Sequence, residues 1–304
     1  YIIVHKNIQL LFKQKDLEKK EKRFLEAEIF SYSWPLIVVG TLYNFLYWTD
    51  SLVLGYFNDA VVIGIYNAAI TLIFFFAIAQ DLFIQLFFPM LSEKYAQNKK
   101  EVLRDISKQV MKWVYMINIV IFAALFIFPG VMINLFFGAD YIAAEAPLRI
   151  LAFGALLSGF LGLLLILISI KGKTKTILMD YLIFTILNLL LDVILVKSYG
   201  MNGAAIATSI SFVLFTFVVL FQIKKFYGFF PVKSVMIKIT VVAAVLLLLA
   251  YLIHDYFSHT ITNMIIFGIM FLIVYMLALF LTGCFDEQDW EILRLIKSKV
   301  IRNK

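Results

Sequence analysis

The residues of this sequence that could do chemistry are polar side chains set inside apolar stretches, above all Asp81 and Asp192. A carboxylate at the centre of a bilayer costs about 2.5 to 3.5 kcal/mol on insertion scales, so such a group usually faces a protein interior or water. The chemistry open to it there is exchange of a proton or a cation, or contact with polar cargo.

Helical phase, at roughly 100° per residue, groups further polar residues with these two carboxylates. Asn67 and Gln85 share a face with Asp81, while Thr185 and Asn188 share a face with Asp192. We predict that the following residues bind substrate or line a lumen: Asn44, Asp50, Asn67, Thr71, Asp81, Gln85, Thr185, Asn188 and Asp192.

A simpler interpretation exists for part of this set. Asn67, Thr71 and Asn188 could have a purely structural role and simply hydrogen-bond between packed helices. Asp50, near the end of its apolar run, could be an interfacial carboxylate, which costs little.

Catalytic chemistry finds no support in the sequence. It has no Ser/His/Asp set, no His-rich metal spacing and no phosphate-binding glycine loop. We therefore expect no catalytic residues, no metal ligands, no cofactor and no enzymatic activity; coupling to H+ or Na+ is the possible exception, and movement of a substrate is the expected task. Nucleic acid is not an expected partner, despite the net charge of +7.

Composition indicates the elements that must position these residues. The chain is 63% hydrophobic and 15% charged, with a mean hydropathy of +0.94, which is typical of a polytopic membrane protein. A span needs about 20 helical residues. We predict an all-α membrane bundle of about eight transmembrane helices, at residues 30–54, 62–89, 110–135, 148–170, 176–196, 204–223, 235–253 and 262–283.

The basic residues predict how the chain crosses the membrane. Of 27 Lys and Arg, all but Arg149 and Lys197 fall in alternate connections or at the two ends of the chain. The positive-inside rule then puts both ends in the cytoplasm. We expect four regions: a cytoplasmic amphipathic linker (1–29), a six-helix half-bundle (30–223), two additional apolar helices (224–283) and a cytoplasmic basic tail (284–304).

Two shorter patterns concern backbone geometry. Gly154, Ser158 and Gly162 recur at four-residue spacing in the predicted fourth helix, which favours a small-residue packing face. Gly200 and Gly203 lie between the fifth and sixth runs and predict a tight turn.

Several motifs together resemble a known family. The segment Gly172–Lys175, Asn188 and the run Tyr199–Thr208 are similar to the second-half signature of polysaccharide flippases, the oligosaccharide-lipid exporters of the MATE-related superfamily. Further stretches agree with that signature in the same order: Ser33–Leu36, Ile63–Ala69, Phe88–Glu93 and Leu135–Tyr141.

The resemblance implies one half of a pseudosymmetric bundle of about 12 to 14 helices that works by alternating access in the plasma membrane of a prokaryote. It implies that the protein flips a polyprenyl-pyrophosphate-linked oligosaccharide from the cytoplasmic to the outer leaflet for cell-surface polysaccharide biosynthesis. The partners would be that lipid-linked sugar, membrane lipids and a missing N-terminal half. The alternative is a MATE-type cation-coupled exporter of small organic molecules, which the acidic lumen residues would suit, since no Lys or Arg lies mid-membrane to meet a pyrophosphate.

Overall fold

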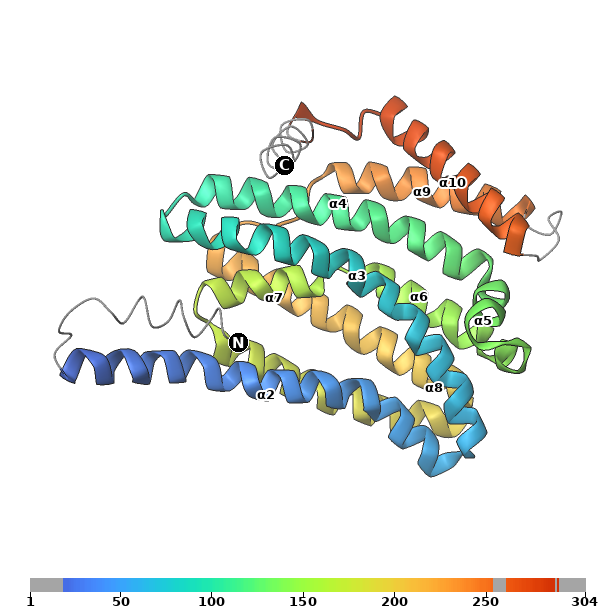
Figure 1. The fold of residues 1–304 in the computed structure, drawn as a ribbon, viewed down its shortest axis with the longest axis horizontal. Helices are drawn as coiled ribbons and strands as arrows, with labels where there is room; N and C mark the ends of the chain where they lie inside the picture. The colour runs from blue at the N-terminus through green and yellow to red at the C-terminus, as the bar shows by residue number, and fades with distance from the viewer. Residues whose placement is uncertain (1–18, 254–260, 288, 290–304) are drawn as a thin grey trace, which may run out of the picture.

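The computed structural model describes residues 19–253, 261–287 and 289, and these residues form helices and no strands (Figure 1). The predicted all-α class is therefore confirmed. The elements are α2 (Lys19–Phe57), α3 (Ala60–Ala96), α4 (Lys100–Ile127), α5 (Pro129–Phe137), the 3-10 helix η1 (Ala139–Ala144), α6 (Glu145–Ser158), α7 (Leu161–Ile170), α8 (Thr174–Tyr227), α9 (Val235–Ile253) and α10 (Ile261–Leu281).

Seven spans in the described residues are long and apolar enough to cross a membrane, which supports a multi-pass membrane protein. Eight runs become seven spans because α8 contains two of them. Helix α2 also begins at Lys19, inside the predicted linker 1–29, and continues without a break past residue 30. Its 39 residues span about 58 Å at 1.5 Å per residue, which is longer than the hydrocarbon core.

The two arms of α8 form a hairpin that turns at a single residue. Gly200 has φ 54° and ψ −132°, and the helix is regular on both sides of it. Asn188 and Thr208 lie 20 positions apart, yet their side chains are 3.2 Å from each other. A Cβ on Gly203 would stand 2.2 Å from the Leu195 carbonyl oxygen, so glycine lets the second arm pass close to the first.

The predicted fourth helix, 148–170, is wrong in one respect: the structure divides it. Helix α6 ends at Ser158 and α7 begins at Leu161. The Gly162 amide donates to Gln80 Oε1 at 3.1 Å, and Asn118 donates to the Gly159 carbonyl at 3.1 Å. Side chains of neighbouring helices thus satisfy backbone groups that the break would leave unpaired inside a membrane.

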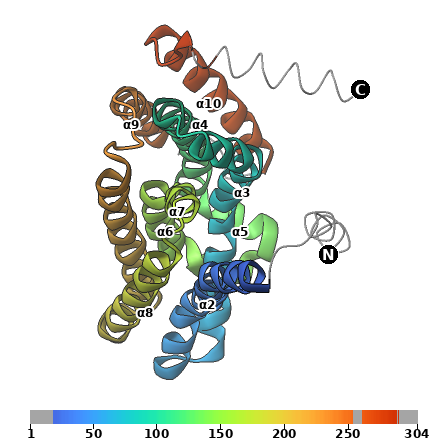
Figure 2. The same cartoon turned by 90° about the vertical axis from the view of Figure 1, so that its left-hand side faces the viewer.

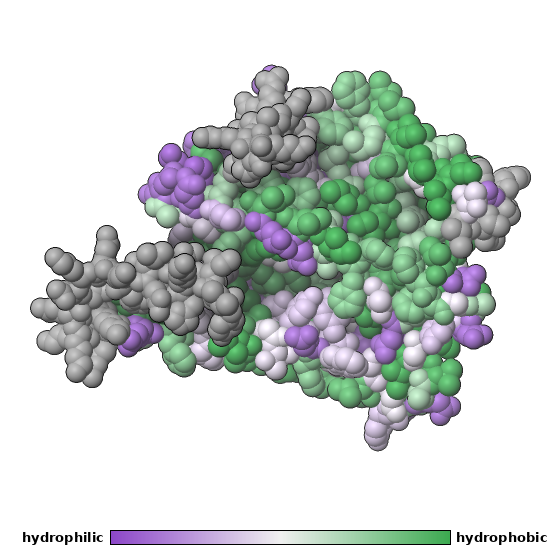
Figure 3. Space-filling model, viewed as in Figure 1, coloured by the Kyte–Doolittle hydropathy of each residue, from purple (hydrophilic) through white to green (hydrophobic). Residues whose placement is uncertain are grey.

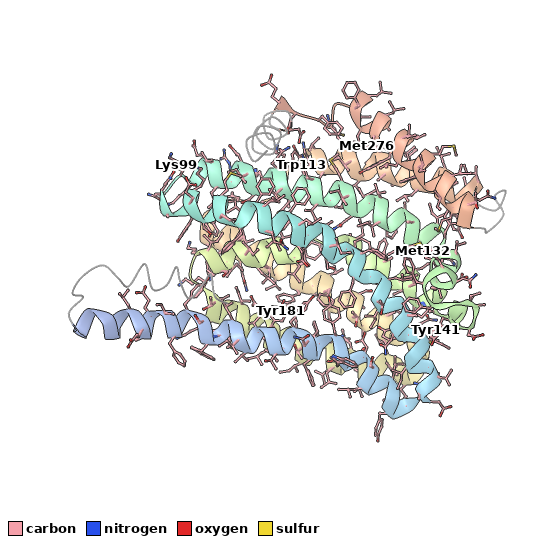
Figure 4. The ribbon with its side chains drawn as sticks, in the orientation of Figure 1. Lys99, Trp113, Met132, Tyr141, Tyr181 and Met276 are labelled. Carbon is pink, nitrogen blue, oxygen red and sulfur yellow. The ribbon has the colours of Figure 1, made fainter. Side chains whose placement is uncertain are left out.

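The basic connections gather at one end of the bundle, which we call the basic end. Tyr32 reaches Ser169 with 2.8 Å between their hydroxyl oxygens, and the Tyr95 and Tyr227 rings are 6.1 Å apart, which brings α2, α3, α7 and the end of α8 together there. The α2–α3 connection, η1 and Gly200 lie at the opposite end. Figure 4 labels Lys99 at the first end and Tyr141 at the second, and Figure 3 shows an apolar surface over much of the face between them.

Helices α9 and α10 lie at one side of the bundle, next to α4 and away from α2 (Figure 2). An ion network at the basic end fastens the segment after α10 to α4. The fully buried Lys112 ammonium lies 2.5 Å from Asp289 Oδ2 and 3.4 Å from Asp286 Oδ2. Trp113 also donates to Asp289, and Lys233 at the start of α9 bonds to Asp286 at 2.7 Å.

Replacing Lys112 by Met should destabilise the protein by about 3 to 5 kcal/mol, because it leaves the buried Asp289 carboxylate without a cation. Thermal unfolding in detergent measures the loss. The matched control is Arg104→Gln, which breaks an exposed pair with Asp105 and should leave the melting temperature close to that of wild type. Equal, small losses of stability in the two variants would show that the ion network does not stabilise the protein.

The difference in stability between wild type and Lys112→Met should also depend on pH. Burial by itself would raise the pKa of Asp286, but hydrogen bonds from Lys233 and Asp289 and the charge of Lys112 hold that pKa below its ordinary value. A lowered pKa contributes stability that is complete at neutral pH and lost as the pH falls through the acid range. The gap in melting temperature between wild type and Lys112→Met should therefore narrow toward about pH 4; a gap that stays constant or widens would contradict the network.

Candidate functional site

A partly open cavity lies among α2, α3, α6, α7 and α8; about 950 Å³ of space in it is free of the chain's atoms, part of it open to the surroundings. Its wall is mostly apolar, with Leu46, Ile73 and Phe76 among its residues, and it carries separate polar groups from four helices. The polar side chains in the wall are those of Tyr43, Tyr47, Asp50, Gln80, Ser158, Tyr181, Thr208 and Ser209. Gly154 and Gly162 are small residues of the same wall.

Small residues make this space possible. A Cβ on Gly154 would come within 2.8 Å of the Ser209 backbone, and a Cβ on Gly162 would meet the Gln80 amide at 2.4 Å. Gly154, Ser158 and Gly162 therefore pack against neighbouring helices and also line the cavity.

A buried polar cluster forms one end of the cavity and is centred on Asp50, whose exposed fraction is 1%. The Tyr66 hydroxyl donates to Asp50 Oδ2. Thr208 Oγ1 lies 2.8 and 2.7 Å from the two carboxylate oxygens, and Asn188 Nδ2 donates to Thr208 at 3.2 Å. We call Asp50, Tyr66, Asn188, Asp192 and Thr208 the acidic cluster.

The second carboxyl group of the cluster has no donor. Asp192 is fully buried and faces Asp50, and apart from that carboxyl group neither of its oxygen atoms has a hydrogen-bond partner among the described residues. Asn188 Oδ1 and Thr185 Oγ1, on the same face of α8, are also buried without a partner. Among the residues that the structure describes, no Lys or Arg is paired with either carboxyl group. The cluster is thus rich in acceptors and poor in donors and positive charge.

Four members of the cluster, Asp50, Tyr66, Asp192 and Thr208, lie at a similar depth although they come from four helical segments. Asp50 precedes the α2–α3 connection by about two turns, and Tyr66 follows it by about two turns. Asp192 and Thr208 each stand eight positions from Gly200. At 1.5 Å per residue, all are about 10 to 12 Å from the end opposite the basic end, which is within the membrane.

The predicted site residues fall into two groups. Asp50, Asn188 and Asp192 belong to the acidic cluster, with Thr185 buried one turn along α8 and Asn67 accepting from Ser51 at 2.9 Å. The structure does not bring the rest into the cluster or the cavity wall; these are Asn44, Thr71, Asp81 and Gln85, all exposed on this chain.

The outer group occupies a second surface. Asp81 acts electrostatically on Tyr47 of α2, and Tyr47 lines the cavity. Asn44 and Thr71 bond back to carbonyls of their own helices, Gly40 and Asn67. Whether this outer group touches substrate stays a prediction.

Three contributors escaped the sequence prediction. Tyr66 and Thr208 lie within the motifs that carried the family resemblance, but a tyrosine and a threonine in an apolar run give no signal of pairing with a distant carboxylate. Gln80 is adjacent to Asp81 and points to the other face of α3, where it lines the cavity and bonds to Gly162. Three tyrosines form a further group, with ring centroids 4.9 Å apart for Tyr43 and Tyr47 and 6.5 Å apart for Tyr43 and Tyr181, the last labelled in Figure 4.

Comparisons with known proteins agree with the sequence motifs. A family profile described as "Polysaccharide biosynthesis protein" matches residues 18–146. The chain is 26% identical over 194 residues to an uncharacterized membrane protein of Methanocaldococcus jannaschii, covering 64% of this chain and 38% of the relative. It is 24% identical over 204 residues to the probable low-salt glycan biosynthesis flippase Agl15 of Haloferax volcanii, covering 65% of this chain and 42% of the relative.

A solved structure confirms the fold. The lipid II flippase MurJ in an inward closed conformation matches with a TM-score of 0.64 and 19% sequence identity, covering 86% of this chain and 56% of that chain. The chain therefore spans about two fifths of the curated relatives and just over half of the solved one. The resemblance to the polysaccharide flippase family is confirmed.

Replacing Tyr66 by Phe should lower the stability of the protein by about 1 to 3 kcal/mol, since it removes a donor from the buried Asp50 carboxyl and leaves no water to replace it. The change in thermal midpoint in detergent measures this loss. Tyr43→Phe is the control, because the Tyr43 hydroxyl donates only a long 3.3 Å bond at an exposed position. If both variants melted like wild type, the cluster would not be a specific hydrogen-bonded unit.

Proposed function

We propose that this chain, which is related to the flippases of polysaccharide biosynthesis, is part of a membrane transporter that moves a polyprenyl-pyrophosphate-linked oligosaccharide from the cytoplasmic to the outer leaflet. The observation that carries the proposal is the cavity of mixed character next to the acidic cluster in a MurJ-like fold. A cation-coupled cycle of alternating access is the mechanism we infer.

The cavity suits an amphiphilic cargo. Sugars cannot cross hydrocarbon without polar partners, because each unpaired hydroxyl costs several kcal/mol there, on the order of 2 to 7. Tyr43, Tyr47 and Gln80 present hydroxyl and amide groups to the cavity, and tyrosine rings offer flat apolar faces as well. The apolar remainder of the wall, together with α9 and α10 at the side of the bundle, would leave the lipid tail in the bilayer.

The basic end of the bundle faces the cytoplasm in this proposal, in accord with the positive-inside rule. The acidic cluster then lies in the outer half of the membrane. The membrane would be the plasma membrane of a prokaryote, and the remaining helices of a two-half transporter would cover the exposed face that carries Asp81 and Gln85. A cation for the pyrophosphate would also come from that other half.

The acidic cluster would bind the coupling ion, H+ or Na+. Two adjacent buried carboxylates cannot both stay charged without compensation, because each has left water and each repels the other. A proton shared between Asp50 and Asp192 removes one charge. A bound Na+ would instead use the carboxylate oxygens, Asn188 Oδ1 and Thr208 Oγ1, the oxygen donors that hard cations prefer.

Ion binding would change the packing of the cluster's helices. The cluster joins α2, α3 and both arms of α8, so filling or emptying it changes the electrostatic attraction among those four segments. A ligand shifts a conformational equilibrium only by its difference in affinity for the two states. The ion would therefore drive transport if the cluster is intact in one state and opened in the other.

Asp192→Asn should abolish ion-driven flipping of a fluorescent polyprenyl-pyrophosphate oligosaccharide in liposomes, with a loss of about a hundredfold or more, because an amide can neither exchange a proton nor neutralise Na+. The control is Asp59→Asn, which removes an exposed carboxylate in the α2–α3 connection, outside the cluster, the cavity wall and the predicted site residues. The two ions separate when a sodium gradient and a pH gradient are imposed in turn. Transport and ion dependence unchanged in Asp192→Asn would remove the cluster from the mechanism.

The same liposomes test the wider assignment. A MATE-type exporter would move small cationic dyes, and the burial of two carboxylates next to a cavity is the observation in its favour. Dye transport without movement of the lipid-linked sugar would select it over flipping, and elongation of the glycan by the purified protein would replace transport by enzymatic activity.

A further inference from the structure

Arg149 lies at the end of the bundle opposite the basic end, where two hollows meet. One is a pocket with polar lining between α4, α5 and α6, enclosing about 700 Å³ and lined by Asn134, Glu145 and Arg149 among others. The other is a groove of about 600 Å³ on the outer surface of α4, α6 and α8, which presents apolar surface and is also bordered by Arg149 and Ser209. Arg149 lines both.

The apolar groove runs down the membrane-facing side of the bundle from Arg149. Its walls are Phe126, Ile150, Phe153, Ile206 and Ile210. Phe153 and Ile210 are 55% and 42% exposed, so the groove opens outward to the surroundings of the protein. Phe153 stands one turn deeper than Arg149 on α6, and Ile210 one turn deeper than Ile206 on α8, which gives the groove the direction of a lipid chain.

The Arg149 guanidinium is oriented, and its Nη atoms make no hydrogen bond to a residue that the structure describes. Its Nε donates to the Phe126 carbonyl at 3.2 Å, at the end of α4, which fixes the plane of the group. Its Nη2 lies 3.8 Å from Glu145 Oε2, too far for a hydrogen bond, and the two side chains are 37% and 35% exposed. A fixed guanidinium with free Nη atoms is suited to two parallel bonds to a phosphate.

Glu145 adds a second charge of opposite sign to the polar pocket. A Cβ on Gly130 would stand 2.1 Å from Glu145 Oε1, so the carboxylate lies directly against the start of α5 and glycine makes room for it. A loosely paired Arg and Glu side by side complement a headgroup that carries a phosphate and an ammonium ion. Such a headgroup would give each of them the close partner that they do not give each other.

We propose that Arg149 and Glu145 bind an aminophospholipid at the membrane surface opposite the basic end, with its phosphate on the Arg149 guanidinium, its ammonium group on Glu145 and one acyl chain in the groove between Phe153 and Ile210. This site faces outward from the bundle; its groove shares Ser209 with the cavity that we assign to the cargo, and its other lining residues are not part of that cavity. It needs neither the proposed substrate nor the coupling ion.

Native mass spectrometry of the purified protein, titrated with three lipids of identical chains, tests the site. The lipids are phosphatidylethanolamine, phosphatidylglycerol and diacylglycerol, which has no phosphate. Wild type should retain phosphatidylethanolamine at least about tenfold better than diacylglycerol, since a bidentate bond to a charged phosphate is lost in the latter. Arg149→Gln should remove that advantage, and Glu145→Gln should keep it but abolish the preference over phosphatidylglycerol.

Two further variants make the result decisive. Lys197→Gln changes the other basic residue at the end of the bundle opposite the basic end. Lys197 does not line the groove, so this variant should bind the lipids like wild type. Ile210→Trp fills the groove at a half-exposed position and should weaken all three lipids severalfold, which keeps the test open if Arg149→Gln does not fold. Equal retention of diacylglycerol and phosphatidylethanolamine by wild type, or undiminished phosphatidylethanolamine binding by folded Arg149→Gln or by Ile210→Trp, would overturn the proposal.

Discussion

Two carboxyl groups, Asp50 and Asp192, lie side by side in the membrane interior, and no Lys or Arg of the described residues is paired with them; the rest of the structure can be understood from that constraint. Taking a carboxylate out of water costs several kcal/mol even after the protein relaxes. Tyr66 and Thr208 offset part of the cost for Asp50 by donating hydrogen bonds. Nothing among the described residues does so for Asp192. We propose that an ion from solution, H+ or Na+, completes this group.

Several backbone features serve to bring these groups together. Gly200 reverses α8 so that Asn188 and Asp192 on one arm meet Thr208 on the other. The short α2–α3 connection similarly places Asp50 opposite Tyr66. The break between α6 and α7 opens the adjacent cavity while Gln80 and Asn118 satisfy the backbone at the break. Irregular backbone inside a membrane is tolerated where protein groups pair with it, and here it borders the cavity.

The fold could be predicted from the sequence much better than the site could. Hydropathy and length defined the spans, because a run of about 20 apolar residues has few alternatives to a membrane helix. Helical phase put Asn188 and Asp192 on one face, since that relation is local. The sequence indicates Asp50 as a candidate site residue but also allows it to be an interfacial carboxylate. Its distance from the end of its apolar run can be counted in the sequence, whereas its contact with Thr208, 158 positions away, cannot be predicted from it.

The errors share a physical origin. A four-residue repeat of small residues predicts close packing, but not that the helix breaks after Ser158, because that depends on Gln80 and Asn118 of other helices. Asp81 lies in an apolar run, as Asp192 does, yet it stands at an exposed position of this chain, and its contact with substrate stays a prediction. Which face of a membrane helix meets protein is set by its neighbours, and a single sequence does not name them.

The central claim is that the acidic cluster requires a cation from solution. Its most direct test is the thermal stability of the purified protein in Na+ against a large organic cation, at pH 6 and pH 8, beside the double variant Asp50→Asn, Asp192→Asn. A bound ion stabilises the folded state by mass action. Wild type should melt higher either in Na+ or at the lower pH, and the double variant should lose that response. Identical responses of the two proteins would contradict the account.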